Sequence, residues 1–275
     1  MRQQVTHISS GSNARVKALV KLRRQRARRR TGLFIADGLR QVTRALEAGL
    51  VLRQLYRCSS MLDAVQLPPV PPDAEQFEVT SGVFTKLAYC ENPQGIVGVF
   101  EQRCWTFEQV TVQAPPAPQL WLVSIGATKP GNVGAMARSA EAAGATGLVL
   151  ADSRVDPYNP NAIRSSTGAV FTLPIIIGSS QSIIDRFMQQ RTTIIAADPN
   201  TARRYTDVDM TGPVALVVGG EDQGLGPDWC LAAQRGDLGR LVQIPMFSQT
   251  VDSLNASAVA AVLLFEALRQ RHIKR

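Results

Sequence analysis

Short apolar runs alternate with segments of helical periodicity through the second half of the chain. The runs predict strands at 120–125, 147–151, 170–177, 192–197, 213–218 and 241–245. Helices are predicted at 133–143, at 180–190, near 227–235 and from about 253 to 271, and 152–164 is predicted as a loop. Strands that alternate with helices in this way are typical of a mostly parallel sheet covered on both faces. The predicted fold class is therefore α/β.

The first half predicts a second, smaller α/β unit. Its apolar runs favour strands at 32–36, 52–56, 77–79 and 96–100, with a helix at 40–48 that ends at Gly49 and a turn of helix at 83–87. The proline-rich stretch 113–119 fits neither a β-strand nor a helix and is typical of a linker. We therefore predict one domain at 1–112, a linker at 113–119 and a second domain at 120–275.

The loop after the first strand of the second domain carries polar residues that a connection does not need. It lies at the carboxyl end of a strand, the edge where open α/β sheets bind ligands. Asn132 and Arg138 are six residues apart, and Gly131 and Gly134 leave the backbone open to close approach. The P-loop signature fails here, because Asn132-Val133 stands where Lys-Ser/Thr is required. The same residues also fit a purely structural interpretation, in which Asn132 caps a helix, the glycines form a turn and Arg138 lies on the surface. The pattern does not choose between this interpretation and a ligand-binding loop.

Two further strand-end loops are candidates for a binding site. The first, 217–226, contains four glycines, whose backbone N–H groups could face a ligand, and Glu221, which offers an acceptor. In the second, 243–255, a strand ends near Pro245, and Ser253 is placed to cap the final helix. Taken separately, each loop also fits a tight turn or a simple cap.

The positive charge of the chain is concentrated near its start. The net charge is +8, yet residues 1–36 contain ten Lys and Arg and no acid, whereas the rest of the chain carries 20 basic and 22 acidic residues. Like charges at helical spacing destabilise a helix, so a cluster without compensating acids indicates a function, and clustered guanidinium groups suit phosphate. This segment therefore predicts a basic helix that contacts nucleic acid, and a solvated charged face is the alternative. The residues predicted for this contact are Arg15, Lys17, Lys21, Arg23, Arg24, Arg28, Arg29 and Arg30.

Composition excludes several other classes of protein. The four cysteines form no C-x-x-C pair and the two histidines lie near the two ends, so we expect neither a metal site nor a Cys–His or Ser–His nucleophile. No apolar run approaches the roughly 18 residues of a membrane-spanning helix. The first residues contain no apolar core of a secretory signal. We expect a cytoplasmic protein without a membrane partner.

Taken in order, the three loops resemble the three signature motifs of the SpoU/TrmH branch of the SPOUT methyltransferases. The matching stretches are Asn132-x-Gly134-x-x-x-Arg138, Val218-Gly219-Gly220-Glu221-x-x-Gly224, and Ile244-Pro245-Met246 followed by Ser253-Leu254-Asn255. Asp156 to Pro160, Arg164 to Ala169 and, in the first domain, Ser12 to Lys17 and Phe34 to Gly38 are also similar to the family. The third loop is one residue longer than the family pattern between Met246 and Leu254.

The resemblance implies a fold and an activity. Family members transfer a methyl group from S-adenosyl-L-methionine to ribose 2′-hydroxyls in RNA, and they tie the C-terminal part of the sheet domain into a trefoil knot. They also work as homodimers and carry a small ribosomal-protein-like α/β domain that binds the RNA substrate. Ribosomal RNA is favoured over transfer RNA as the substrate, and a non-catalytic RNA-binding or ribosome-assembly factor is the alternative.

The resemblance also implies roles for individual residues. Arg138 would be the main catalytic residue, with Asn132, Ser253 and Asn255 orienting it and the ribose. The positions implied for the cofactor are Gly219, Gly220, Glu221, Ile244, Met246 and Leu254.

Overall fold

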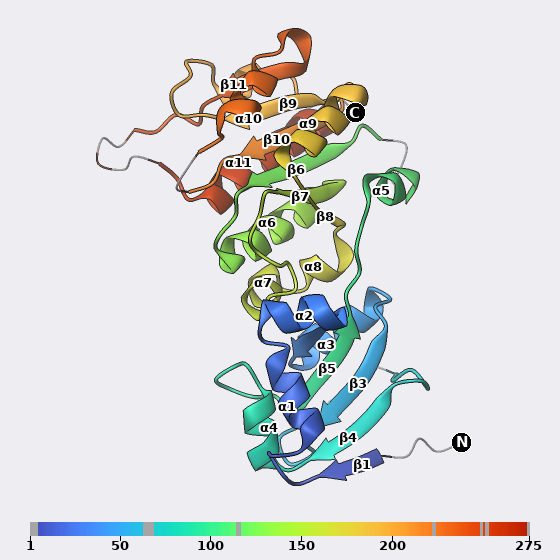
Figure 1. The fold of residues 1–275 in the computed structure, drawn as a ribbon. Helices are drawn as coiled ribbons and strands as arrows, with labels where there is room; N and C mark the ends of the chain where they lie inside the picture. Colours follow the sequence, from blue (N-terminus) through green and yellow to red (C-terminus); the bar gives the residue numbers. More distant parts are fainter. Residues whose placement is uncertain are drawn as a thin grey trace. The chain divides into compact units, whose positions relative to one another are not determined.

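The computed structural model describes residues 5–62, 69–113, 117–221, 224–247, 250 and 253–273 (Figure 1). The chain divides into two compact units. The first runs to Arg103 and also contains Tyr158–Phe171, whereas the second contains Cys104–Pro157 and the chain from Thr172 onward. The domain boundary at 113–119 stays a prediction, and residues 114–116 of it lie outside the described residues.

A five-stranded mixed sheet forms the centre of the first unit. Its spatial order is β1 (Val5–Ile8), β4 (Glu75–Val79), β3 (Leu52–Arg57), β5 (Ile96–Glu101) and β2 (Leu33–Asp37). The first three strands in this order pair in parallel, and β5 runs antiparallel to both β3 and β2. The sequence did not predict strand β1, because this strand is only four residues long and too polar to form an apolar run.

Four helices pack around this sheet: α1 (Ala14–Lys21), α2 (Gln25–Thr31), α3 (Leu39–Glu47) and α4 (Ser81–Leu87). The prediction of one continuous basic helix is wrong, since a turn at Leu22 to Arg24 separates α1 from α2. Gly32, at φ 67°, ends α2 in the left-handed conformation and lets the chain enter β2 directly. The core of the unit combines Val16 and Leu19 of α1 with residues of all five strands, among them the stacked pair Tyr56 and Phe77.

The segment 158–171 belongs to the first unit although it lies between two strands of the second. It contains α7 (Pro160–Ser166) and most of α8 (Ala169–Thr172). The rings of Tyr158 and Phe171 stack on Phe34 of β2 at centroid distances of 4.4 and 5.6 Å. Arg44 of α3 donates a 2.5 Å hydrogen bond to the carbonyl of Thr167. The loop predicted over 152–164 is confirmed up to residue 159 but is wrong from Pro160, where α7 begins. The start of the strand predicted at 170 is also wrong, because α8 occupies it.

The second unit is built on a six-stranded sheet in which every pair is parallel. The order is β11 (Gly239–Val242), β9 (Thr193–Ala197), β10 (Val214–Val218), β6 (Leu120–Ile125), β7 (Gly147–Ala151) and β8 (Ile175–Gly178). Nearly all residues of the central strands β6, β7 and β10 are buried, as expected for a sheet covered on both faces. This confirms the predicted mostly parallel α/β fold.

Helices cover both faces of this sheet (Figure 1). Buried residues of α5 (Phe107–Gln113), α9 (Ser180–Gln189) and α10 (Pro227–Ala233) share a core with Trp121 and Val123 of β6. On the other face, α6 (Pro130–Ala142) packs against β7 and against α11 (Ala256–Ile273), which also contacts β10. Two short 3-10 turns, Tyr205–Asp207 and Gly236–Leu238, complete the unit. No helix in the described part of the chain is both long and apolar enough to cross a membrane.

Candidate active site

A cavity of about 440 Å³ lies where β9, β10 and β11 end. Parallel strands bring their carboxyl ends to one edge of a sheet, so the loops that follow them meet there. The walls combine apolar side chains with a glycine-rich backbone and a few polar groups. They are formed by Lys129, Ala197, Asp198, Pro199, Val218, Gly219, Gly220, Glu221, Gly224, Val242, Ile244, Met246, Ser253, Leu254, Asn255, Ala256 and Val259. All six residues predicted for the cofactor are among them, and so are Ser253 and Asn255.

The glycine-rich loop folds back on itself as a tight hairpin. Gly220 and Gly224 exchange two backbone hydrogen bonds of 2.9 and 3.0 Å. A Cβ atom on Gly219 would lie 2.4 Å from the backbone carbon of Gly224, so this position excludes any side chain for reasons internal to the loop. Substitution of Gly219 would therefore distort the hairpin as well as the cavity.

A chain of polar contacts connects the three loops at the rim of the cavity. Asn132 donates its side-chain N–H to one carboxylate oxygen of Glu221, and the ammonium group of Lys129 pairs with the other. The Oδ1 atom of Asn132 accepts a 3.4 Å hydrogen bond from Nδ2 of Asn255. Asn132 and Asn255 therefore meet, as the resemblance implies, and Lys129 joins them although sequence reasoning did not select it.

The start of the final helix differs from the prediction. Helix α11 begins at Ala256, and Asn255 rather than Ser253 acts as its cap, because the Asn255 carboxamide oxygen accepts hydrogen bonds from the N–H and hydroxyl of Ser257 at 2.9 and 2.6 Å. Ser253 lines the cavity as an exposed loop residue. Residues 248, 249, 251 and 252 of this loop lie outside the described residues.

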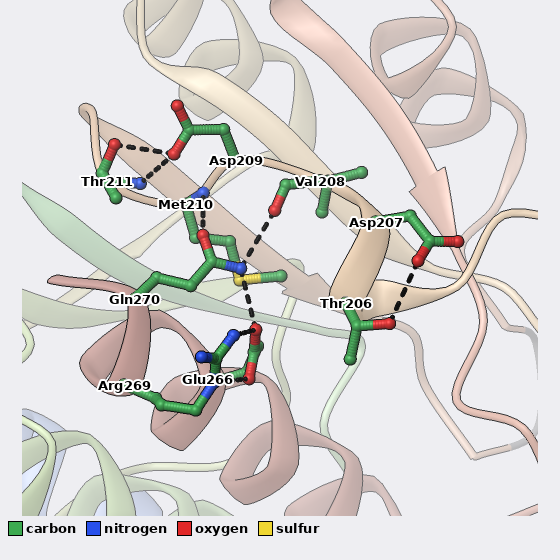
Figure 2. A network of polar contacts seen from close by, with 9 residues as sticks. All are labelled: Thr206, Asp207, Val208, Asp209, Met210, Thr211, Glu266, Arg269 and Gln270. Atoms are coloured by element: carbon green, nitrogen blue, oxygen red, sulfur yellow. Dashed lines mark hydrogen bonds and ion pairs between the residues drawn. The ribbon is translucent and has the colours of Figure 1, made fainter. Parts of the chain in front are cut away.

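The far end of α11 is held in place by a polar network that Figure 2 shows. Gln270 accepts a 2.9 Å hydrogen bond from the N–H of Met210 and donates one of 3.0 Å to the carbonyl of Val208. Glu266 is buried and receives two hydrogen bonds from Arg269, at 2.7 and 2.8 Å, which hold the pKa of its carboxyl below the ordinary value.

Arg138 occupies a different place from the other predicted catalytic residues. Helix α6 starts at Pro130 rather than at the predicted 133, so Asn132 lies inside its first turn and Arg138 about two turns further along. The Arg138 side chain is exposed and does not line the cavity. No hydrogen bond or ion pair joins it to another residue in the described ranges. Within one chain, the structure therefore does not bring Arg138 to Ser253 and Asn255.

The model of the SpoU rRNA Methylase family matches residues 119–265, which include most of the second unit. The chain belongs to this family. A second model, the MRM3-like substrate binding domain, matches residues 13–98. The resemblance noted in the sequence is thereby confirmed.

Individual relatives of this SpoU methylase match along nearly its whole length. It is 31% identical to a 23S rRNA (uridine(2479)-2′-O)-methyltransferase of Streptomyces viridochromogenes, over 89% of this chain and 85% of the relative. A crystal structure of an RNA 2′-O ribose methyltransferase superposes with a TM-score of 0.80 at 36% identity and covers 97% of this chain and 100% of that one. The SpoU methyltransferase AviRb of Streptomyces viridochromogenes, in complex with AdoMet, gives 0.81 at 28% identity, with coverages of 94% and 98%.

The basic segment of the SpoU chain divides into exposed and structural residues. Lys17, Lys21, Arg24, Arg29 and Arg30 are exposed, and none of their side chains has a hydrogen bond or ion pair within the part of the chain that the structure describes. Arg15 is also exposed and pairs with Glu75 at 2.8 Å.

Two arginines of the segment serve the fold instead. Arg28 is completely buried, and its Nη1 atom donates to the carbonyls of Leu22 and Arg23 at 2.8 and 2.9 Å. Arg23 uses its Nη2 atom for three carbonyls at the end of α4. The prediction that Arg28 contacts RNA is contradicted by its burial, because phosphate cannot reach the guanidinium group.

Sequence reasoning missed several residues of the cavity wall. Asp198 and Pro199 follow β9, and their position at a strand end was the available signal. Val259 lies one turn into α11, and nothing in its local sequence separates it from an ordinary core residue.

Proposed function

We propose that this chain methylates the ribose 2′-hydroxyl of a nucleotide in structured RNA, with S-adenosyl-L-methionine as methyl donor and ribosomal RNA as the favoured substrate. The observation that carries the proposal is the cavity at the ends of β9, β10 and β11, in which all six residues predicted for the cofactor meet. Membership of the SpoU rRNA methylase family and the 2′-O-methyltransferase relatives support it.

The residues present suit S-adenosyl-L-methionine. Val242, Ile244, Met246 and Leu254 provide an apolar surface for a purine ring, and Gly219, Gly220 and Gly224 line the cavity beside it without side chains. Glu221 adds a carboxylate that can accept hydrogen bonds. The bound cofactor would supply a methyl group on a positively charged sulfur, and the protein would have to position and activate the ribose oxygen.

We assign that activation to Arg138. An arginine stays protonated at neutral pH, so it acts by charge and by directed hydrogen bonds rather than as a base. Its guanidinium fork can hold a phosphate of the target nucleotide while it stabilises negative charge that develops on the 2′-oxygen. Asn132, Ser253 and Asn255 would orient the ribose at the rim of the cavity.

Because Arg138 lies away from the cavity of its own chain, we propose that it acts in the site of a second copy within a homodimer. The exposed position of Arg138 on α6 supports this, and so does Phe265, 48% exposed on α11, the helix that packs against α6. The likeness in fold to SpoU structures supports a trefoil knot around the third loop. A cytoplasmic location completes the proposal.

The first experiment measures transfer of labelled methyl groups to unmodified ribosomal and transfer RNA, followed by mapping of alkali-resistant linkages. We expect label at one linkage of ribosomal RNA and none with Arg138→Ala. Arg138→Lys should also lose most activity, because an ammonium group lacks the planar fork. Cofactor binding without transfer to either RNA would instead point to an assembled particle as the substrate or to a non-catalytic RNA-binding factor, and label in transfer RNA would correct the substrate.

A mixing experiment tests the shared site. Arg138→Ala and the cavity-blocking Leu254→Trp should each be inactive, whereas randomly mixed dimers should recover roughly a quarter of the wild-type rate, since half are mixed and each mixed dimer has one complete site. A mixture no more active than its components would show that Arg138 acts within its own chain.

A further inference from the structure

A second cavity, of about 290 Å³, lies within the first unit and is not explained by the cofactor site. It is lined by Arg23, Ile35, Asp37, Gly38, Arg40, Gln41, Tyr89, Cys90, Glu91, Asn92, Gln94, Pro160, Ile163 and Arg164. Two stretches that carry the family resemblance, Phe34 to Gly38 and Arg164 to Ala169, therefore contribute to one cavity although about 130 residues separate them. The methyl-transfer chemistry uses neither stretch.

Tyr89 forms a fixed aromatic wall of this cavity. Its backbone N–H donates to the carboxylate of Asp37 at 2.5 Å, and its hydroxyl donates to Oδ1 of Asn161 at 3.3 Å. The guanidinium carbon of Arg23 lies 5.9 Å from the ring centroid, and Arg23 is itself held by the carbonyls that precede Tyr89. The side chain nevertheless remains 41% exposed. Such a ring offers a surface for stacking at little cost in conformational entropy.

Two arginines that line the same cavity as Tyr89 form no ion pair within the part of the chain that the structure describes. Arg40 lies in the first turn of α3 and Arg164 in the last turn of α7, and both are exposed. The side chain of neither arginine makes a hydrogen bond or ion pair with any residue in the described ranges. The two carboxylates of the lining, Asp37 and Glu91, form no ion pair with either arginine within the described residues, and Oδ2 of Asp37 accepts the backbone N–H groups of Tyr89 and Cys90. The cavity therefore combines an aromatic face with two available guanidinium groups.

We propose that this cavity binds one unpaired nucleotide of the RNA substrate, whose base stacks on Tyr89 and whose phosphate contacts Arg40 and Arg164. Proteins recognise single-stranded RNA by this combination of an aromatic ring and arginine. The volume lies at the lower limit of roughly 300–1,000 Å³ for small-molecule pockets, which suits one nucleotide and not a longer segment. The inference rests on the proposed function in that the substrate is RNA. It assigns substrate binding to Arg164, although this residue lies inside the stretch that matches the methylase model.

Binding of two RNA probes tests the proposal. One is a hairpin with an unpaired loop, and the other is a blunt duplex with the same number of phosphates. The wild-type protein should prefer the hairpin. Tyr89→Ala should weaken hairpin binding roughly five- to hundredfold, the range found when one stacked base loses its aromatic partner, and should leave duplex binding within about twofold. Tyr89→Phe, which keeps the ring, should behave like the wild type.

Charge variants provide the matched control. Arg164→Ala should weaken hairpin binding selectively, whereas Arg29→Ala, on the exposed basic surface, should weaken both probes alike because it removes only a positive charge that faces phosphate. Thermal melting and cofactor affinity should stay at wild-type values in all these variants.

Three results would overturn the proposal: no preference of the wild type for the hairpin, equal weakening of both probes by Tyr89→Ala, or no effect of that substitution on either. Because the assay measures binding, it is independent of turnover. A protein that prefers the hairpin through Tyr89 but never transfers a methyl group would refute the proposed function and leave this inference intact.

Discussion

Replacement of Arg28 distinguishes the structural arginine of the basic segment from its exposed neighbours. Arg28→Met keeps a long apolar stem in the buried position and removes the guanidinium group. The carbonyls of Leu22 and Arg23, which form the turn between α1 and α2, then lose the donor that satisfies them. We expect the first unit to be destabilised while the exposed positive charge of the surface hardly changes.

The size of the effect follows from the two hydrogen bonds. A buried acceptor left without a partner costs about 1–3 kcal/mol, and the bond to Leu22 is buried whereas that to Arg23 is partly buried, so we expect a loss of at least about 1–3 kcal/mol. At 1.36 kcal/mol per factor of ten, this raises the unfolded fraction at least roughly fivefold. In contrast, the double substitution Arg29→Ala and Arg30→Ala touches no hydrogen bond within the described residues and should change stability by less than about 0.5 kcal/mol per site.

Urea unfolding of the full chain, followed by the fluorescence of a probe in the first unit, measures the first effect, and the salt dependence of RNA affinity measures the second. Arg28→Met should lower the unfolding midpoint and keep the salt slope under conditions where the unit is folded. The double variant should keep the midpoint and reduce the slope by about two, because the protein then neutralises two fewer phosphates. The reasoning would be refuted if Arg28→Met reduced the salt slope without a change in the midpoint, because the guanidinium group would then have to be available to RNA.

Two further predictions concern the second unit. Asn132→Ala removes a hydrogen bond to the charged Glu221, worth about 1.5–3 kcal/mol, and should slow single-turnover methyl transfer roughly ten- to hundredfold. Lys129→Met removes an ion pair whose lysine is largely exposed, so it should slow the same step less than about fivefold. A larger effect of Lys129→Met than of Asn132→Ala would contradict the geometry of the rim. Arg269 lowers the folded-state pKa of Glu266, so this carboxyl stabilises the fold above its unfolded pKa of about 4.3, and the stabilisation is lost as the pH falls through the lower folded value. Glu266→Gln should therefore be less stable than the wild type at neutral pH and approach it in acid, and parallel pH profiles of the unfolding free energy would refute this.

The sequence predicted the central strands well because their signal is local. Residues 120–125 and 213–218 form runs that are apolar except for Ser124, and burial on both faces of a parallel sheet favours such runs. The run that begins at Ala169 was misleading, since a short, mostly apolar segment fits a buried helix turn as well as a strand. Helix α7 was missed although Asn159 followed by Pro160 is a regular start signal, with the Asn159 side chain accepting from the N–H of Asn161.

The candidate site was predicted in part, for reasons that differ between residues. The cavity residues came from glycine and apolar positions at strand ends, where a parallel sheet must bring its loops together. The burial of Arg28 could not be predicted, because its sequence context is the same as that of Arg29 and Arg30. Only the turn that begins at Leu22 directs the Arg28 side chain into the interior. The separation of Arg138 from the cavity depends on where α6 begins, a boundary that the sequence places only within a few residues.

The packing of residues 158–171 with the first unit has a consequence for how this protein can be cut or recombined. A methylase fragment that starts at residue 117 would keep Tyr158 and Phe171 but lose Phe34, the ring on which both stack, and would expose apolar rings on the crossover between β7 and β8. Exchange of the first hundred residues with those of a relative would require the two ring positions and Arg44 to be matched to the incoming partner. The substrate-binding half is therefore not an independent cassette, and chimeras intended to redirect such an enzyme to another RNA should carry residues 158–171 together with it.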